Sequence, residues 1–170
     1  MSRALAIGFV AISALLILSQ ALATEPVAPL PGPQSAYLLG CGGCHGYRGV
    51  SNTLLVPRLK DLVGFFLYTP EGRAYLPRLP NIAFADMDNR KLAAVLNYIV
   101  FELGGGSAPA GAKPYSEREV SQLRKAPLTE VALFRYRQKI VDALIEQHDA
   151  PLALRDYGKD LYRAGDYSSR

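Results

Sequence analysis

The chain is poor in the residues that build metal clusters and disulfide frameworks. Its 170 residues include two Cys, two His, two Met and no Trp. A structural zinc site takes about four Cys or His ligands, so one would require every Cys and His of the chain. A disulfide between Cys41 and Cys44 would close a loop too small to add much stability. The cysteine pair therefore indicates chemistry rather than a structural framework.

Long apolar runs are also scarce, since there is one, over residues 4–18. It follows Arg3 and precedes an Ala-x-Ala sequence ending at Ala23, which is the pattern of a secretory signal peptide. The run is shorter than the ~20 residues of a membrane span, although an uncleaved anchor is the alternative. We therefore predict a signal peptide over residues 1–23, location in the periplasm, and no stable membrane span after cleavage.

Alternating strand patterns and internal repeats are absent, so the predicted fold is all-α. A Pro-rich leader over 24–33 should precede a domain over 34–104, a linker over 105–114 and a C-terminal helical extension over 115–170. Asp88 is a good N-cap, and the three glycines from Gly104 are a strong stop signal. Residues 69–86, with three prolines, are expected to be irregular, and the last 20 residues form a polar tail. Helices are predicted over 34–41, 59–68, 88–103, 116–127 and 129–148.

Cys41, Cys44 and His45 form a Cys-x-x-Cys-His sequence, which is the attachment motif of a covalently bound haem (heme c). Two thiols one helical turn apart can add to the two vinyl groups at one porphyrin edge. The adjacent imidazole then falls under the iron as the proximal ligand. A thioredoxin-like thiol site is the alternative, but it normally follows a strand, and none is predicted before Cys41. We therefore predict one haem c, with His45 bound to its iron.

With this motif, residues 34–103 resemble the class I cytochrome c family. The resemblance implies that the Pro57 carbonyl accepts the Nδ1 proton of His45, which orients the ring. It also implies a crossing of the first and last helices of the domain, with Tyr37 and Tyr98 at the contact.

The family's distal ligand is usually a Met before the last helix, and Met87 is the candidate here. However, Met87 directly precedes the cap of that helix, and residues 79–82 (Leu-Pro-Asn-Ile) occupy the segment where the ligand is expected. Met87 is also spaced as a hydrophobic staple with Leu92, so both roles stay open. Of the imidazoles, only His148 remains as another candidate. Met ligation would raise the reduction potential, whereas an open position would admit small ligands.

Other side chains could complete such a site. Arg58, Arg73 and Arg78 could pair with haem propionates or lie as solvated cations. Apolar side chains could wall the haem or simply form core, and these are Phe65, Phe66, Leu67, Ile82, Leu92 and Leu96.

The resemblance implies electron transfer rather than enzymatic catalysis. We expect a periplasmic carrier, or the cytochrome subunit of a dehydrogenase, that exchanges electrons with a periplasmic dehydrogenase or terminal oxidase. The chain's charge of +4 is too mild to suggest a nucleic-acid partner. Residues 113–139 carry a local charge of +4, which could steer docking or be a solvated helix face. A haem enzyme or ligand sensor with an open distal site is the alternative function, and a thiol oxidoreductase, which would be colourless, is the third.

Overall fold

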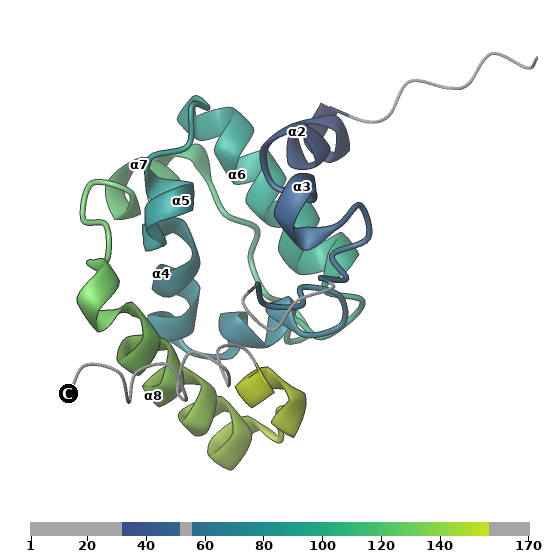
Figure 1. Ribbon diagram of the computed structural model, residues 1–170, viewed down its shortest axis with the longest axis vertical. Coiled ribbons are helices and arrows are strands. Elements are labelled where there is room, and N and C mark those ends of the chain that lie inside the picture. Colours follow the sequence, from purple (N-terminus) through teal and green to yellow (C-terminus); the bar gives the residue numbers. More distant parts are fainter. Residues whose placement is uncertain (1–31, 52–55, 157–170) are drawn as a thin grey trace, which may run out of the picture. The chain divides into compact units, whose positions relative to one another are not determined.

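The computed structural model describes residues 32–51 and 56–156, which fall within one compact unit, Pro31–Arg170. All regular structure in these two ranges is helical, so the all-α prediction is confirmed (Figure 1). The predicted signal peptide, most of the leader and residues 157–170 of the tail lie outside the described residues. In the described ranges, no helix is both long and apolar enough to cross a membrane.

The N-terminal part contains two helices, α2 (Gly32–Gly40) and α3 (Gly42–His45). Because α2 begins at Gly32, the prediction of an extended leader up to residue 33 was wrong for its last two residues. A proline in the first turn of a helix costs no hydrogen bond, because the first N–H groups have no intrahelical partner. Pro33 therefore belongs to the helix rather than to the leader.

The middle segment is helical where the sequence predicted irregular structure. A 3₁₀ helix, η1 (Val63–Tyr68), covers only the end of the helix predicted over 59–68, and it is followed by α4 (Pro70–Arg78) and α5 (Pro80–Ala83). Pro70 and Pro80 are the first residues of α4 and α5, a position that favours proline. The Thr69 hydroxyl accepts a hydrogen bond from the Gly72 N–H at 3.0 Å and caps α4. Residues 69–86 were wrongly predicted because their prolines were interpreted as breaks rather than helix starts.

The next helix, α6 (Asn89–Asn97), continues directly as a π-helix, η2 (Tyr98–Leu103). The Asp88 carboxylate accepts the Lys91 N–H at 2.7 Å, as predicted for its N-cap. Helix α2 packs against α6 (Figure 1). At this contact the fully buried Tyr37 ring meets Tyr98 with 5.6 Å between centroids.

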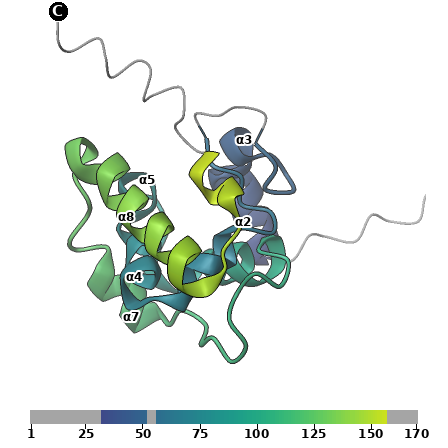
Figure 2. The same ribbon diagram turned by 90° about the horizontal axis from the view of Figure 1, so that it is seen from below.

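The C-terminal part forms α7 (Glu117–Leu123), α8 (Glu130–His148) and a 3₁₀ helix, η3 (Leu152–Asp156). Helix α7 packs on α6 and α4, while α8 packs on η1, α4 and η3 (Figure 2). Val120 and Leu144 are completely buried, and Leu154 is 2% exposed. The extension therefore shares one hydrophobic core with residues 34–104, and the predicted polar tail is helical over Leu152–Asp156.

Candidate functional site

The imidazole of His45 is fixed from one side. His45 ends the one-turn helix α3, and its Nδ1 lies 3.0 Å from the carbonyl oxygen of Pro57. A carbonyl only accepts, so Nδ1 carries the proton and Nε2 keeps its lone pair. Burial lowers the pKa of His45, an effect that the hydrogen bond to Pro57 opposes. The ring is thus held as the neutral tautomer that a metal ligand requires.

The turn after His45 directs the chain back toward Pro57. Gly46 has φ +73°, and a Cβ there would lie 2.7 Å from the Val50 carbonyl oxygen, so glycine is required. The Tyr37 hydroxyl donates to the Gly46 carbonyl at 2.7 Å. This bond joins the turn to α2, so the contact between Tyr37 and Tyr98 also supports the turn that directly follows His45.

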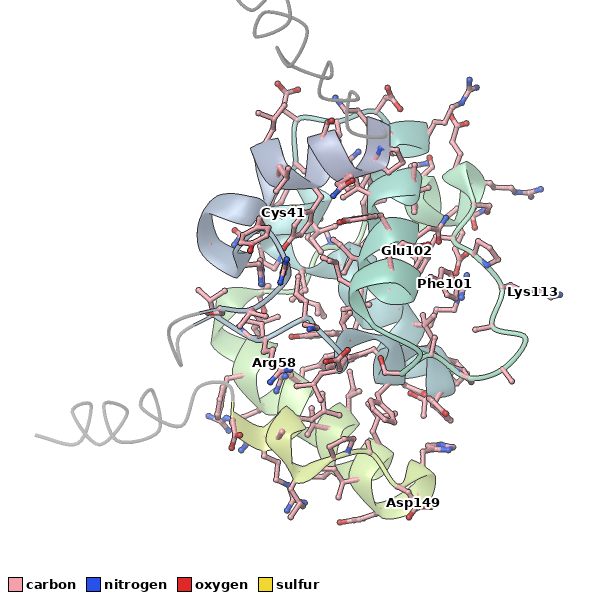
Figure 3. The ribbon with its side chains drawn as sticks, turned by 90° about the vertical axis from the view of Figure 1, so that its right-hand side faces the viewer. Cys41, Arg58, Phe101, Glu102, Lys113 and Asp149 are labelled. Carbon is pink, nitrogen blue, oxygen red and sulfur yellow. The ribbon has the colours of Figure 1, made fainter. Side chains whose placement is uncertain are left out.

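Cys41 and Cys44 lie at the start and within the turn of α3, and both thiols are free. Cys41 is partly buried beside the blue-grey helices of Figure 3, whereas Cys44 is exposed. Burial, and secondarily the neighbouring Cys44, raises the pKa of the Cys41 thiol. Reactive redox cysteines have a lowered pKa, so Cys41 lacks the activation that is typical of a thiol-disulfide site.

A largely apolar cavity of about 360 Å³ opens beside Cys41. Among the described residues no group of three or more Cys, His, Asp and Glu side chains is placed to hold a bare metal ion. Most side chains around the cavity are apolar, which fits an apolar group bound at Cys41. Three of the six predicted haem-wall residues (Ile82, Leu92 and Leu96) line this cavity, while Phe66 instead packs on Tyr75 with 5.4 Å between ring centroids. The cavity is lined by α2 and Cys41 (Ala36, Leu39, Gly40, Cys41), by residues 81–87 (Asn81, Ile82, Ala85, Asp86, Met87) and by α6 with η2 (Lys91, Leu92, Val95, Leu96, Ile99).

Met87 lines this cavity, and its side chain reaches α2. A Cβ built on Gly40 would lie only 2.7 Å from the Met87 Cε atom, so the thioether packs against the backbone beside Cys41. Iron ligation by Met87 stays a prediction. The other imidazole, His148, lies at the end of α8 with its ring 5.2 Å from that of Tyr68, and it is not among the residues that line the cavity.

The three arginines that were candidates for propionate binding all have protein partners, and their contact with propionates stays a prediction. Arg58 makes an exposed pair with Asp61 at 3.3 Å. Arg73 binds both carboxylate oxygens of Glu119, at 2.6 and 2.8 Å, and Arg78 donates to the Ala126 carbonyl at 2.7 Å. Arg73 and Arg78 therefore hold the C-terminal extension against α4.

Sequence reasoning missed the role of Arg124, which it counted with the basic residues of the extension. Its guanidinium donates to the carbonyls of Ala83, Ala85 and Met87 at 2.9, 2.7 and 2.8 Å, and to Asn89 Oδ1 at 3.2 Å. All four acceptors lie between 35 and 41 residues away in the sequence. No local pattern in the sequence marks such a long-range partner.

Comparison with known proteins agrees with a cytochrome c-like chain. The chain is similar to a cytochrome c-552 of Thermus thermophilus, with 28% identity over 118 residues that cover 59% of this chain and 90% of the relative. A second cytochrome c-552, from a named strain of the same species, is also 28% identical over 118 residues, or 80% of its length. No family model matches the chain, and no solved structure matches it significantly.

Proposed function

We propose that this protein is a periplasmic monohaem c-type cytochrome that transfers single electrons. Haem c would be bound through Cys41 and Cys44, with His45 as the proximal iron ligand. The observation that carries this proposal is the hydrogen bond from His45 Nδ1 to Pro57, because it commits one ring nitrogen and leaves the other for iron. The similarity to cytochrome c-552 supports the same function.

When bound, haem c supplies a reversible one-electron couple at its iron. The chain's own residues supply orientation and access. The Pro57 carbonyl holds the proton at Nδ1, which makes His45 a stronger donor and keeps its ring from rotating. Apolar side chains of α6, among them Leu92 and Leu96, line the cavity. Against a bound haem they would keep water from one face, and a less polar environment favours the less charged, reduced state.

The proposed partner is a periplasmic dehydrogenase or terminal oxidase, reached through weak electrostatic docking. The basic region over 113–139 contributes fewer surface charges than its composition suggests. Arg137 is 6% exposed and donates to the Leu154 carbonyl at 3.0 Å. Arg124 donates to the backbone carbonyls of Ala83, Ala85 and Met87. Arg135 and Lys139 are exposed on α8 and are the side chains that we propose for docking.

A redox titration of the purified holoprotein, followed by absorption, tests this function. We expect one reversible transition that follows a one-electron slope of about 59 mV per decade. A variant with Cys41→Ala and Cys44→Ala, exported in parallel, should lack this signal. A wild-type protein without redox-active colour, or with irreversible reduction, would contradict the proposal.

One observation favours a second candidate, a ligand-binding cytochrome with an open distal position. The Met87 thioether packs against Gly40, an arrangement that serves the core without any iron. In this case the reduced protein should bind carbon monoxide readily, and Met87→Ala should leave its spectrum unchanged. Loss of a thioether-to-iron charge-transfer band in Met87→Ala would instead assign the ligand role to Met87.

A further inference from the structure

Residues 83–89 connect α5 with α6 and form one side of the cavity through Ala85 and Met87. The connection makes few backbone hydrogen bonds of its own. Phe84 N–H donates to Pro80, Ala85 N–H to Ile82, and Met87 N–H to Ala85, two residues earlier. Such short-range bonds leave this segment without the regular ladder that fixes a helix. Another group must therefore hold its shape.

The Arg124 guanidinium meets this need. It bonds to three carbonyls on alternate residues, Ala83, Ala85 and Met87, and also to the side chain of Asn89. The planar fork of an arginine presents several donors in a fixed geometry. Hydrogen bonds from a charged donor contribute more than neutral ones. One side chain thus fixes the whole connection from Ala83 to the first residue of α6.

The position of Arg124 is itself fixed by the rest of the extension. Arg124 follows α7 directly, and Val120, one turn earlier in that helix, is completely buried. Glu119 of α7 forms the two-oxygen ion pair with Arg73 of α4. Asn97 exchanges two hydrogen bonds with the Tyr115 backbone, at 2.9 and 2.7 Å, just before α7 begins. The guanidinium is therefore carried by a segment that is bound to both α4 and α6.

We propose that Arg124 is a positioning residue that sets the shape of the haem cavity at Ala85 and Met87. This inference rests on the proposed function and gives the C-terminal extension a role in it. By holding residues 83–89, Arg124 restricts the approach of external ligands to the haem. This effect is expected both if Met87 is the distal ligand and if the distal position is open. Arg124 is not among the residues that line the cavity, so it acts through the connection.

The experiment compares Arg124→Gln and Arg124→Lys with the wild type and with Arg118→Gln as a control. Arg118 lies exposed in α7, the helix that directly precedes Arg124. Hydrogen exchange of the backbone amides in residues 83–91 reports the connection itself. The association rate of imidazole with the oxidised holoprotein reports access to the haem. We expect both rates to rise at least tenfold in both Arg124 variants and to stay unchanged in Arg118→Gln.

Arg124→Lys separates geometry from charge, because lysine keeps the charge but lacks the fork. Asn89→Ala removes one of the four acceptors and should raise both rates less. Wild-type exchange and imidazole rates in Arg124→Lys would overturn the proposal, as would a rise in exchange that is spread over all helices. If the chain binds no haem, the proposed function fails, while the amide exchange still decides whether Arg124 holds the connection.

Discussion

Truncation of Leu144 to alanine should lower the stability of the proposed haem site, although this residue lies in the extension. Leu144 in α8 is completely buried within the core that α8 shares with η1 and α4. Leu→Ala changes at such sites cost about 2–5 kcal/mol, a large part of a typical total of ~5–15 kcal/mol. At roughly 3 °C of melting temperature per kcal/mol for a chain of this size, a loss of about 3 kcal/mol lowers the midpoint by about 10 °C.

Thermal unfolding of the holoprotein should be followed by two probes, far-UV circular dichroism for all helices and haem absorbance for the site. The two midpoints should coincide in the wild type and fall together in Leu144→Ala. Leu152→Ala is the matched control, because Leu152 lies in η3 but is 67% exposed, and its midpoint should stay within about 1–2 °C of the wild type. An early helical transition in Leu144→Ala with an unchanged haem midpoint would refute the shared core.

Three further predictions test local contacts. Tyr37→Phe removes the hydrogen bond to Gly46 and should cost about 1 kcal/mol in urea unfolding. Burial raises the pKa of Tyr37 to about 12, above the value of ~10 in the unfolded chain. The unfolded chain therefore loses this proton first, and the free energy of unfolding falls as the pH rises from about 10 to about 12. Tyr37→Phe should lose less stability over this pH range, and an identical slope in the variant and the wild type would contradict the shift. Gly40→Ala should cost less than about 1 kcal/mol, because the atom that its Cβ would meet is the methyl end of the flexible Met87 side chain, which can shift. The effect should be non-additive in a double-mutant cycle with Met87→Ala, and strictly additive effects would mean that the two side chains do not meet. Arg135→Gln with Lys139→Gln should slow electron exchange with an acidic partner and flatten its salt dependence, and an unchanged salt dependence would remove the docking role.

The sequence indicates candidate site residues where the pattern is local. Cys41, Cys44 and His45 lie within five residues, and the N-cap at Asp88 depends on the next three residues. The Pro57 contact spans twelve residues and followed from the family resemblance rather than from local pattern. The start of α4 at Pro70 was missed because a proline can either end a helix or begin one. The neighbouring residues, here the Thr69 cap, decide which of the two occurs.

Contacts between distant segments could not be predicted in this way. Arg73 and Glu119 are 46 residues apart, and nothing in the sequence distinguishes their pair from other arginines and glutamates. Arg124 and Arg137 appeared as surface charges because composition does not show burial. The role of the extension therefore emerges only from the three-dimensional structure.

The mass of the acid-denatured holoprotein is the most direct test of the central claim. Protein exported from a host with haem c maturation should carry the mass of one haem per chain after unfolding, bound through Cys41 and Cys44. The variant with both cysteines replaced by alanine should have the mass of the polypeptide alone. Haem that separates from the denatured wild-type chain would contradict covalent attachment, and with it the assignment of this site to a c-type cytochrome.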